Sequence, residues 1–173
     1  HDILNRMATD NLAKQLSCSW YSPGGGADPV ADQIFQQMAA QGQSFFNASG
    51  DYDAYTGLIS FPGDTPYMTQ VGGTTLSTSG TGGAWASETV WNWGNGIGSG
   101  GGISTQYPIP PWQAGLNMTT SQGSTTQRNT PDVALTADNV YVRADGVDQN
   151  VGGTSCAAPL WAGFMALVNE QAV

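Results

Sequence analysis

Charged side chains are scarce in this sequence. Asp, Glu, Lys and Arg make up 10% of the 173 residues, against roughly 25% in an average soluble protein. Basic residues are the scarcest, with 4 Lys and Arg against 13 Asp and Glu and a formal net charge of -9. Such a surface repels phosphate backbones, so nucleic acid is not an expected partner. Few ion pairs also leave few carboxylate–cation contacts to lose in acid, which suits an acidic habitat.

Long apolar runs, cysteines and histidines are also few or missing. No run of 18 or more apolar residues occurs, so no membrane-spanning helix is expected. The two cysteines, Cys18 and Cys156, lie far apart in apolar segments, which favours buried thiols over a disulfide. The single histidine is His1, at the chain end. Glycine, in contrast, is abundant at 24 residues, and with 9 prolines it indicates a loop-rich secreted protein with a compact core.

The first half predicts a strand, a helix and a second strand. Residues 15–20 and 44–48 are strand candidates, and between them Asp28-Pro29 starts a helix with an N-cap and a first-turn proline. The apolar face of that helix is expected to hold Val30, Ile34, Phe35 and Met38, with Gly42 as the stop signal. Such a unit implies parallel pairing, with functional loops beyond the carboxyl ends of the strands. An earlier helix is expected from Ile3 to Lys14.

The rest of the chain predicts mostly strands and one further helix. Residues 67–71 and 74–76 are interpreted as strands around a Gly72-Gly73 turn, with another at 88–93, whereas residues 98–102 (GSGGG) hold no fixed shape alone. Strands follow at 133–135, 140–143 and 149–151, with a hairpin at Asp145-Gly146. The helix from Cys156 to about Asn169 is apolar nearly all round and is expected to be buried.

Ser155 is the residue that most suggests chemistry. It follows two glycines and begins the apolar helix, so its hydroxyl is expected at the positive end of a helix dipole, where developing negative charge is favoured. The simpler alternative is a serine that caps the helix.

Several segments together resemble the sedolisin family of serine-carboxyl peptidases. Residues 153–163 (GTSCAAPLWAG) resemble the Gly-Thr-Ser-x-x-x-Pro nucleophile segment that sedolisins share with subtilisins. A Ser–His–Asp triad would have to use His1, whereas sedolisins use a carboxylate base. Further matches occur in the family's order at 17–20 (SCSW), 48–51 (ASGD), 61–74, 88–92 (ETVWN), 98–104 (GSGGGIS) and 131–133 (PDV). The resemblance covers about residues 16–169 and implies an α/β, subtilisin-like fold: a mostly parallel, doubly wound sheet with helices on both faces.

The resemblance implies roles for three residues. Ser155 corresponds to the acyl-forming nucleophile, and Asp51 to the acid that donates a hydrogen bond from its protonated carboxyl to the oxyanion. That role needs low pH, because a carboxyl group keeps its proton only in acid unless its surroundings favour the neutral form. Without the resemblance, Asp51 reads as an Asx-type turn residue. Trp20 corresponds to a tryptophan that supports the carboxylate network, with an ordinary core residue as the alternative.

The glycine-rich segment suggests substrate binding. Ser99, Gly100, Gly101 and Gly102 are interpreted as a strand edge on which an extended peptide pairs through its main chain, with a flexible surface loop as the alternative. Asp132 and Glu88, which lie in family-like segments, are interpreted as structural carboxylates that order loops.

Other parts of the family pattern have no match. The family's Glu and Asp of the base lie upstream of the 17–20 segment, and nothing in residues 1–14 resembles them. Its calcium site follows the nucleophile helix, so calcium is expected in the parent protein but no metal site in this chain. Residues 1–173 are therefore interpreted as a partial catalytic domain, inactive alone, whose parent protein has a prodomain and cleaves peptides or proteins. Two rival hypotheses are a glycosidase that uses Asp51 and Glu88, and a non-catalytic secreted binding module with a Gly- and Trp-rich surface.

Overall fold

The computed structural model describes residues 1–22 and 24–171, which contain three helices and eleven strands. The helices are α1 (Asp2–Asp10), α2 (Pro29–Ala40) and α3 (Thr154–Gln171). The strands are β1 (Gln15–Cys18), β2 (Ser44–Ala48), β3 (Tyr52–Ala54), β4 (Thr69–Thr78), β5 (Trp85–Val90), β6 (Asn92–Gly94), β7 (Ile97–Pro108), β8 (Gln127–Thr130), β9 (Val133–Thr136), β10 (Val140–Ala144) and β11 (Val147–Val151).

The central sheet is mostly parallel, as the sequence predicts. β1 pairs with β2, β2 with the first part of β4, and β4 with β9, all in parallel, while β5 runs antiparallel to the far end of β4. α2 begins where Asp28 and Pro29 indicate, because the Asp28 carboxylate accepts bonds from the backbone N–H groups of Val30 and Ala31. The first helix is shorter than expected, since Asn11 adopts a left-handed conformation that ends α1.

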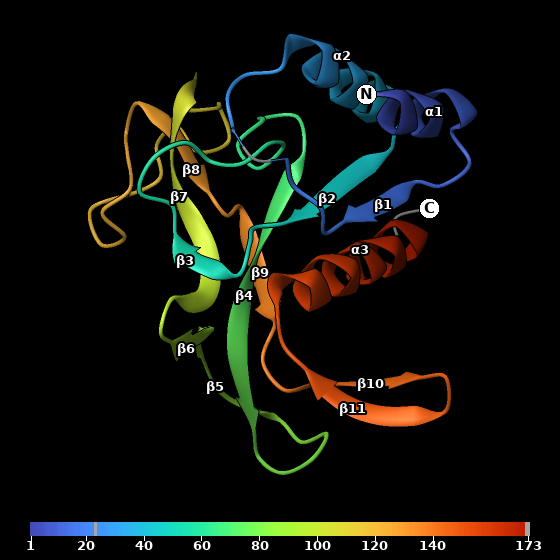
Figure 1. The fold of residues 1–173 in the computed structure, drawn as a ribbon, viewed down its shortest axis with the longest axis vertical. Coiled ribbons are helices and arrows are strands. Elements are labelled where there is room, and N and C mark those ends of the chain that lie inside the picture. Colours follow the sequence, from blue (N-terminus) through green and yellow to red (C-terminus); the bar gives the residue numbers. More distant parts are fainter. Residues whose placement is uncertain (23, 172–173) are drawn as a thin grey trace.

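Helices cover both faces of this sheet (Figure 1). Successive residues of β2 point to opposite faces, so Phe45 packs in the core under α1 and α2, whereas Phe46 packs in the core under α3. On α2 the buried face consists of Ala31, Ile34, Phe35 and Met38. The prediction that Val30 belongs to that face is wrong, because its side chain is 53% exposed.

Gly72 and Gly73 do not form the predicted turn. They lie inside the continuous strand β4, where the side chains of Pro131 and Ala137 approach the strand backbone. A Cβ on Gly72 would lie 2.6 Å from the Pro131 ring, and one on Gly73 would lie 2.6 Å from the Ala137 methyl group. The two glycines are therefore sites of close backbone approach, a requirement that comes from residues distant in sequence.

The glycine-rich segment is also part of a strand. Residues 98–102 lie in β7, which pairs with β3 in parallel and with β6 and β8 antiparallel. The interpretation that this segment has no fixed shape, and its alternative of a flexible loop, are therefore wrong. The Asp145-Gly146 hairpin is confirmed, since β10 and β11 pair around it.

The last helix is only half buried. α3 presents Ala157, Ala158 and Ala162 to the sheet, while Leu160, Phe164 and Leu167 are 44%, 50% and 62% exposed. The expectation of burial all round is wrong for this chain, because the described residues cover one side of α3 alone. No helix among the described residues is both long and apolar enough to cross a bilayer.

Candidate active site

Ser155 lies in the first turn of α3, beyond the carboxyl ends of the parallel strands. Its side chain is exposed and lines a cavity of about 130 Å³ together with Asp51. Gly153 makes the turn into the helix, with φ of +135°, a conformation that side-chain-bearing residues rarely adopt. Ser155 is therefore presented to solvent within a concave site, at a helix N-terminus that favours negative charge.

Asp51 is bound to the residue that precedes Ser155. Its Oδ1 atom accepts hydrogen bonds from the backbone N–H of Thr154 at 2.8 Å and from the Thr154 hydroxyl at 2.7 Å. The same Thr154 Oγ1 accepts a bond from the backbone N–H of Gly50 at 3.1 Å. Thr154, which is 1% exposed, therefore fixes the Gly50-Asp51 turn to the start of α3. Sequence reasoning missed this residue, although it lies in the motif that identifies Ser155.

The other side of the Gly50-Asp51 turn is held by β7. The N–H of Gly98 donates to the Asp51 carbonyl at 3.0 Å, and the N–H of Gly100 donates to the Gly50 carbonyl at 2.7 Å. A Cβ on Gly100 would lie 2.2 Å from the carbonyl oxygen of Ser49. Glycine is therefore required there so that the two backbones can approach.

The four residues predicted to bind substrate already make internal contacts. The Ser99 N–H donates to the Trp91 carbonyl, and its hydroxyl accepts from the N–H of Gly73 at 2.9 Å. The carbonyl of Gly101 accepts from the Tyr55 N–H, and that of Gly102 accepts from the Thr130 hydroxyl. These bonds order β7 against its neighbours, and substrate binding by Ser99, Gly100, Gly101 and Gly102 stays a prediction.

Trp20 follows β1 at the same edge of the sheet, but its side chain is 83% exposed. The alternative that it is a core residue is therefore wrong for this chain. Its neighbours Ser19 and Tyr21 line the Ser155 cavity. A supporting role for Trp20 in a carboxylate network stays a prediction.

Two groups near Asp51 stay protonated over a wide pH range. Burial raises the pKa of Tyr55, and the nearby Tyr21 and Asp51 raise it further. The Tyr55 hydroxyl donates to the Ser49 carbonyl at 3.0 Å. Burial, with a further contribution from Asp51, also raises the pKa of the free thiol of Cys156. A protonated thiol is a poor nucleophile, so Cys156 is a weaker candidate than a serine for nucleophilic chemistry at this site.

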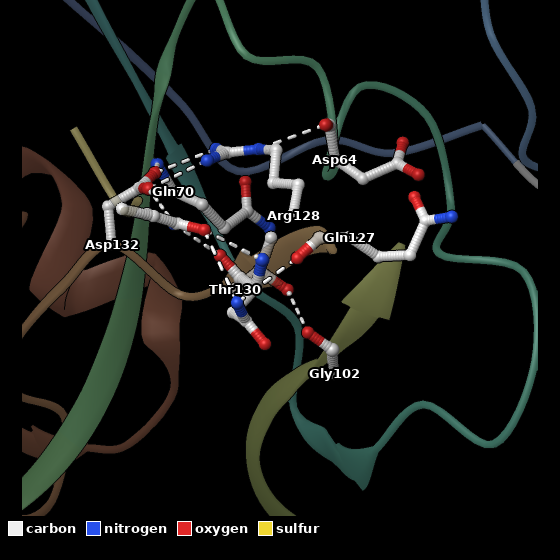
Figure 2. Close-up of polar contacts among 9 residues, drawn as sticks. Asp64, Gln70, Gly102, Gln127, Arg128, Thr130 and Asp132 are labelled. Atoms are coloured by element: carbon white, nitrogen blue, oxygen red, sulfur yellow. Dashed lines mark hydrogen bonds and ion pairs between the residues drawn. The ribbon is translucent and has the colours of Figure 1, made fainter. Parts of the chain in front are cut away.

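Asp132 is a structural carboxylate, as predicted (Figure 2). Both of its oxygens accept bonds from the Arg128 guanidinium at 2.8 Å, and Oδ2 also accepts from the Gln70 N–H at 2.8 Å. Arg128 is completely buried and also donates to the Asp64 carbonyl at 2.9 Å. The sequence did not indicate that Arg128, one of four basic residues, holds this network together.

Glu88 lies on β5, where it accepts a hydrogen bond from the Thr74 hydroxyl. It lines neither of the two cavities that Asp51 lines. The carboxylate pair that a glycosidase would need is therefore not formed by Asp51 and Glu88. Residues 1–22 and 24–171 contain no cluster of three or more His, Cys, Asp or Glu side chains that could hold a metal ion.

The solved structures that share this architecture include proteases. The structure of a psychrophilic S41 protease matches 98% of this chain and 47% of its own, with a TM-score of 0.59 and 19% identity. At that identity the likeness shows the fold alone. The chain therefore has the α/β fold of the subtilisin-like proteases.

Two matches of higher identity indicate which kind of protease the chain is similar to. Sedolisin from Pseudomonas, a serine-carboxyl proteinase solved with two molecules of pseudo-iodotyrostatin, has a TM-score of 0.73 and 32% identity over 96% of this chain and 51% of its own. Xanthomonalisin from Xanthomonas sp. (strain T-22) is 34% identical over 97% of this chain and 25% of its own length. No family model matches the sequence. The chain belongs to the sedolisin family, as a partial domain that spans about a quarter to a third of the curated relatives it matches.

Proposed function

We propose that the protein containing this chain is a serine-type endopeptidase that works at acid pH. The observation that carries the proposal is that Ser155 and Asp51 line one cavity at the N-terminus of α3. The reaction is acyl transfer. The Ser155 Oγ attacks the peptide carbonyl while its proton passes to a carboxylate supplied outside residues 1–173. The C–N bond then breaks, the leaving amine takes a proton, and water hydrolyses the ester.

Asp51 donates the hydrogen bond that stabilises the oxyanion in this proposal. Both bonds from Thr154 go to Oδ1, so the proton of the neutral carboxyl belongs on Oδ2, which has no such donors. A donor fixed in this way needs little reorganisation during the reaction, which is the main source of electrostatic catalysis. Because the carboxyl group has to be protonated, activity is expected to rise as the pH falls below about 5.

The remaining parts of the proposal concern the parent protein. It is secreted, carries a prodomain and takes peptides or proteins as substrates, in agreement with its acidic composition and its peptidase relatives. Calcium is bound outside the described residues. The chain of residues 1–173 alone is inactive, because a serine without a base is a weak nucleophile.

The test uses the full-length protein and a peptide aldehyde, which forms a hemiacetal with a catalytic serine and so resembles the tetrahedral intermediate. Wild type is expected to cleave peptides in acid and to bind the aldehyde covalently, whereas Ser155→Ala does neither. Asp51→Ala is expected to bind the aldehyde more weakly and to lose at least 100-fold in kcat. Undiminished peptidase activity in Ser155→Ala would refute the proposal.

A further inference from the structure

A second and larger cavity adjoins the nucleophile site. A cavity of about 420 Å³ shares Asp51, Tyr52 and Tyr55 with the one that contains Ser155. It also shares residues 54–57 with a third cavity of about 870 Å³. The three cavities therefore follow one another along the segment that begins at Asp51. The largest has a volume typical of ligand sites in proteins.

Large apolar side chains surround this third cavity. Trp112 and Leu116, which follow β7, are 54% and 58% exposed, and Ile103 on β7 is 41% exposed. Single exposed apolar residues are common on protein surfaces, but three around one hollow indicate a binding site. Their burial by a ligand would remove apolar surface from water.

The amide of Gln113 and the carboxylate of Asp132, two polar groups that line the cavity, are already paired. The Gln113 amide donates to the Asn129 carbonyl at 2.7 Å and to Asp132 at 3.2 Å, and its oxygen accepts from the Asn129 N–H at 2.9 Å. The charge of Asp132 is neutralised by Arg128, as Figure 2 shows. No Lys or Arg is among the described residues that line the cavity. The lining therefore favours a neutral, apolar ligand.

We propose that the third cavity, lined by Trp112 and Leu116, is a further substrate subsite. It takes a large apolar side chain of the peptide at a position away from the scissile bond. The inference rests on the proposed function, because continuity with the Ser155 cavity is what selects a peptide substrate as the occupant. Trp112 and Leu116 are specificity residues in this assignment. The buried network of Arg128, Asp132 and Gln113 keeps the cavity in shape and positions β8 under it.

The experiment measures peptide cleavage by the full-length protein. A peptide series keeps the two residues at the scissile bond constant and moves a single Leu, compared with Ser, through the other positions. At one position Leu is expected to raise kcat/KM about tenfold over Ser, as burial of one side chain in an apolar pocket allows. In Trp112→Ala and in Leu116→Ser, this Leu/Ser ratio falls towards one.

Matched controls use exposed residues outside the three cavities. Trp85→Ala on β5 removes a tryptophan that is 66% exposed, and Leu12→Ser removes a leucine that is 89% exposed. Both are expected to keep the tenfold Leu/Ser ratio. If no position gives a ratio that depends on Trp112 and Leu116, the subsite does not exist.

A binding measurement separates this proposal from the proposed function. Calorimetry with the full-length Ser155→Ala protein and the same Leu and Ser peptides should give Kd values that differ about tenfold, and this difference should disappear when Trp112→Ala is added. That result supports the subsite even if wild type cleaves nothing. Equal Kd values for the two peptides would overturn it. Self-association that is lost in Trp112→Ala would overturn it as well, since the occupant would then be a second copy of the protein.

Discussion

The guanidinium of Arg128 binds both carboxylate oxygens of Asp132, four residues along the chain, at 2.8 Å each. Arg128 is fully buried, and the Asp132 side chain is 14% exposed. A buried ion pair is costly to form, but removal of one partner leaves an uncompensated charge in the interior. The pair also joins β8, β9 and the start of β4, because Asp132 accepts the Gln70 N–H.

Loss of Arg128 should therefore destabilise the fold. Arg128→Met is expected to lower the free energy of unfolding by about 3–5 kcal/mol, measured by urea denaturation. The matched control is Arg143→Met, which breaks an ion pair with Asp148 whose side chains are 60% and 53% exposed. That change should cost less than about 1 kcal/mol. Similar losses in both variants would contradict the structural role of Arg128.

The two glycines of β4 should not tolerate side chains. Gly73→Ala places a methyl group 2.6 Å from Ala137 and is expected to cost about 1–3 kcal/mol of stability through overpacking. Gly163→Ala provides the opposite case, since a Cβ at that position of α3 meets nothing within 4 Å. It should raise stability by about 0.5–1 kcal/mol, because alanine favours a helix more than glycine does. Thermal unfolding of the two variants would check the difference in sign.

Features set by neighbouring residues could be predicted from the sequence, whereas features set by contacts between distant residues could not. The start of α2 follows from Asp28 and Pro29 alone, and the β10–β11 hairpin follows from Asp145-Gly146, because each depends on neighbouring residues. The role of Gly73 depends on Ala137, and that of Thr154 depends on a carboxylate 103 residues away, so neither could be read from local pattern. The local pattern at the start of the last helix made Ser155 a candidate and the family resemblance added Asp51, but neither pointed to Thr154, which joins them. The exposed face of α3 was missed because composition does not tell which side of a helix is covered.

Thr154 should be essential for the position of Asp51. In the full-length protein, Thr154→Val removes the hydroxyl that donates to Asp51 and accepts from Gly50, so kcat is expected to fall about 10- to 100-fold. Stability should fall by about 1–3 kcal/mol, because buried partners lose their hydrogen bonds. Thr154→Ser retains the hydroxyl and serves as the control, with kcat close to that of wild type. Equal kcat values for the Val and Ser variants would exclude this positioning role.

Asp64 should make stability depend on pH. Burial raises its pKa, partly offset by the hydrogen bond from Ser104 and by Arg128, so the folded state favours the neutral acid. The stability that comes from this preference is complete below the pKa of an unfolded Asp, about 3.9, and is lost as the pH rises through the folded value. The side chain in Asp64→Asn cannot ionise, so the stability of this variant does not show the same loss as the pH rises. The unfolding free energy of wild type minus that of Asp64→Asn should therefore decrease from about pH 4 upwards. Urea denaturation at several pH values would measure this difference. A difference that increases with pH would contradict the assignment.

Because Thr154 and Ser155 are adjacent on α3, the proposed acid Asp51 and the proposed nucleophile Ser155 are held by the same turn of one helix. A small slide or tilt of the helix carries Thr154 with it, and the two bonds to Oδ1 pull the Asp51 carboxyl along in the same direction. The spacing between Asp51 and Ser155 is therefore set by the start of α3 together with β7, which holds the backbone of Gly50 and Asp51. Substitutions that loosen the start of α3 should consequently move Ser155 and the Asp51 carboxyl together.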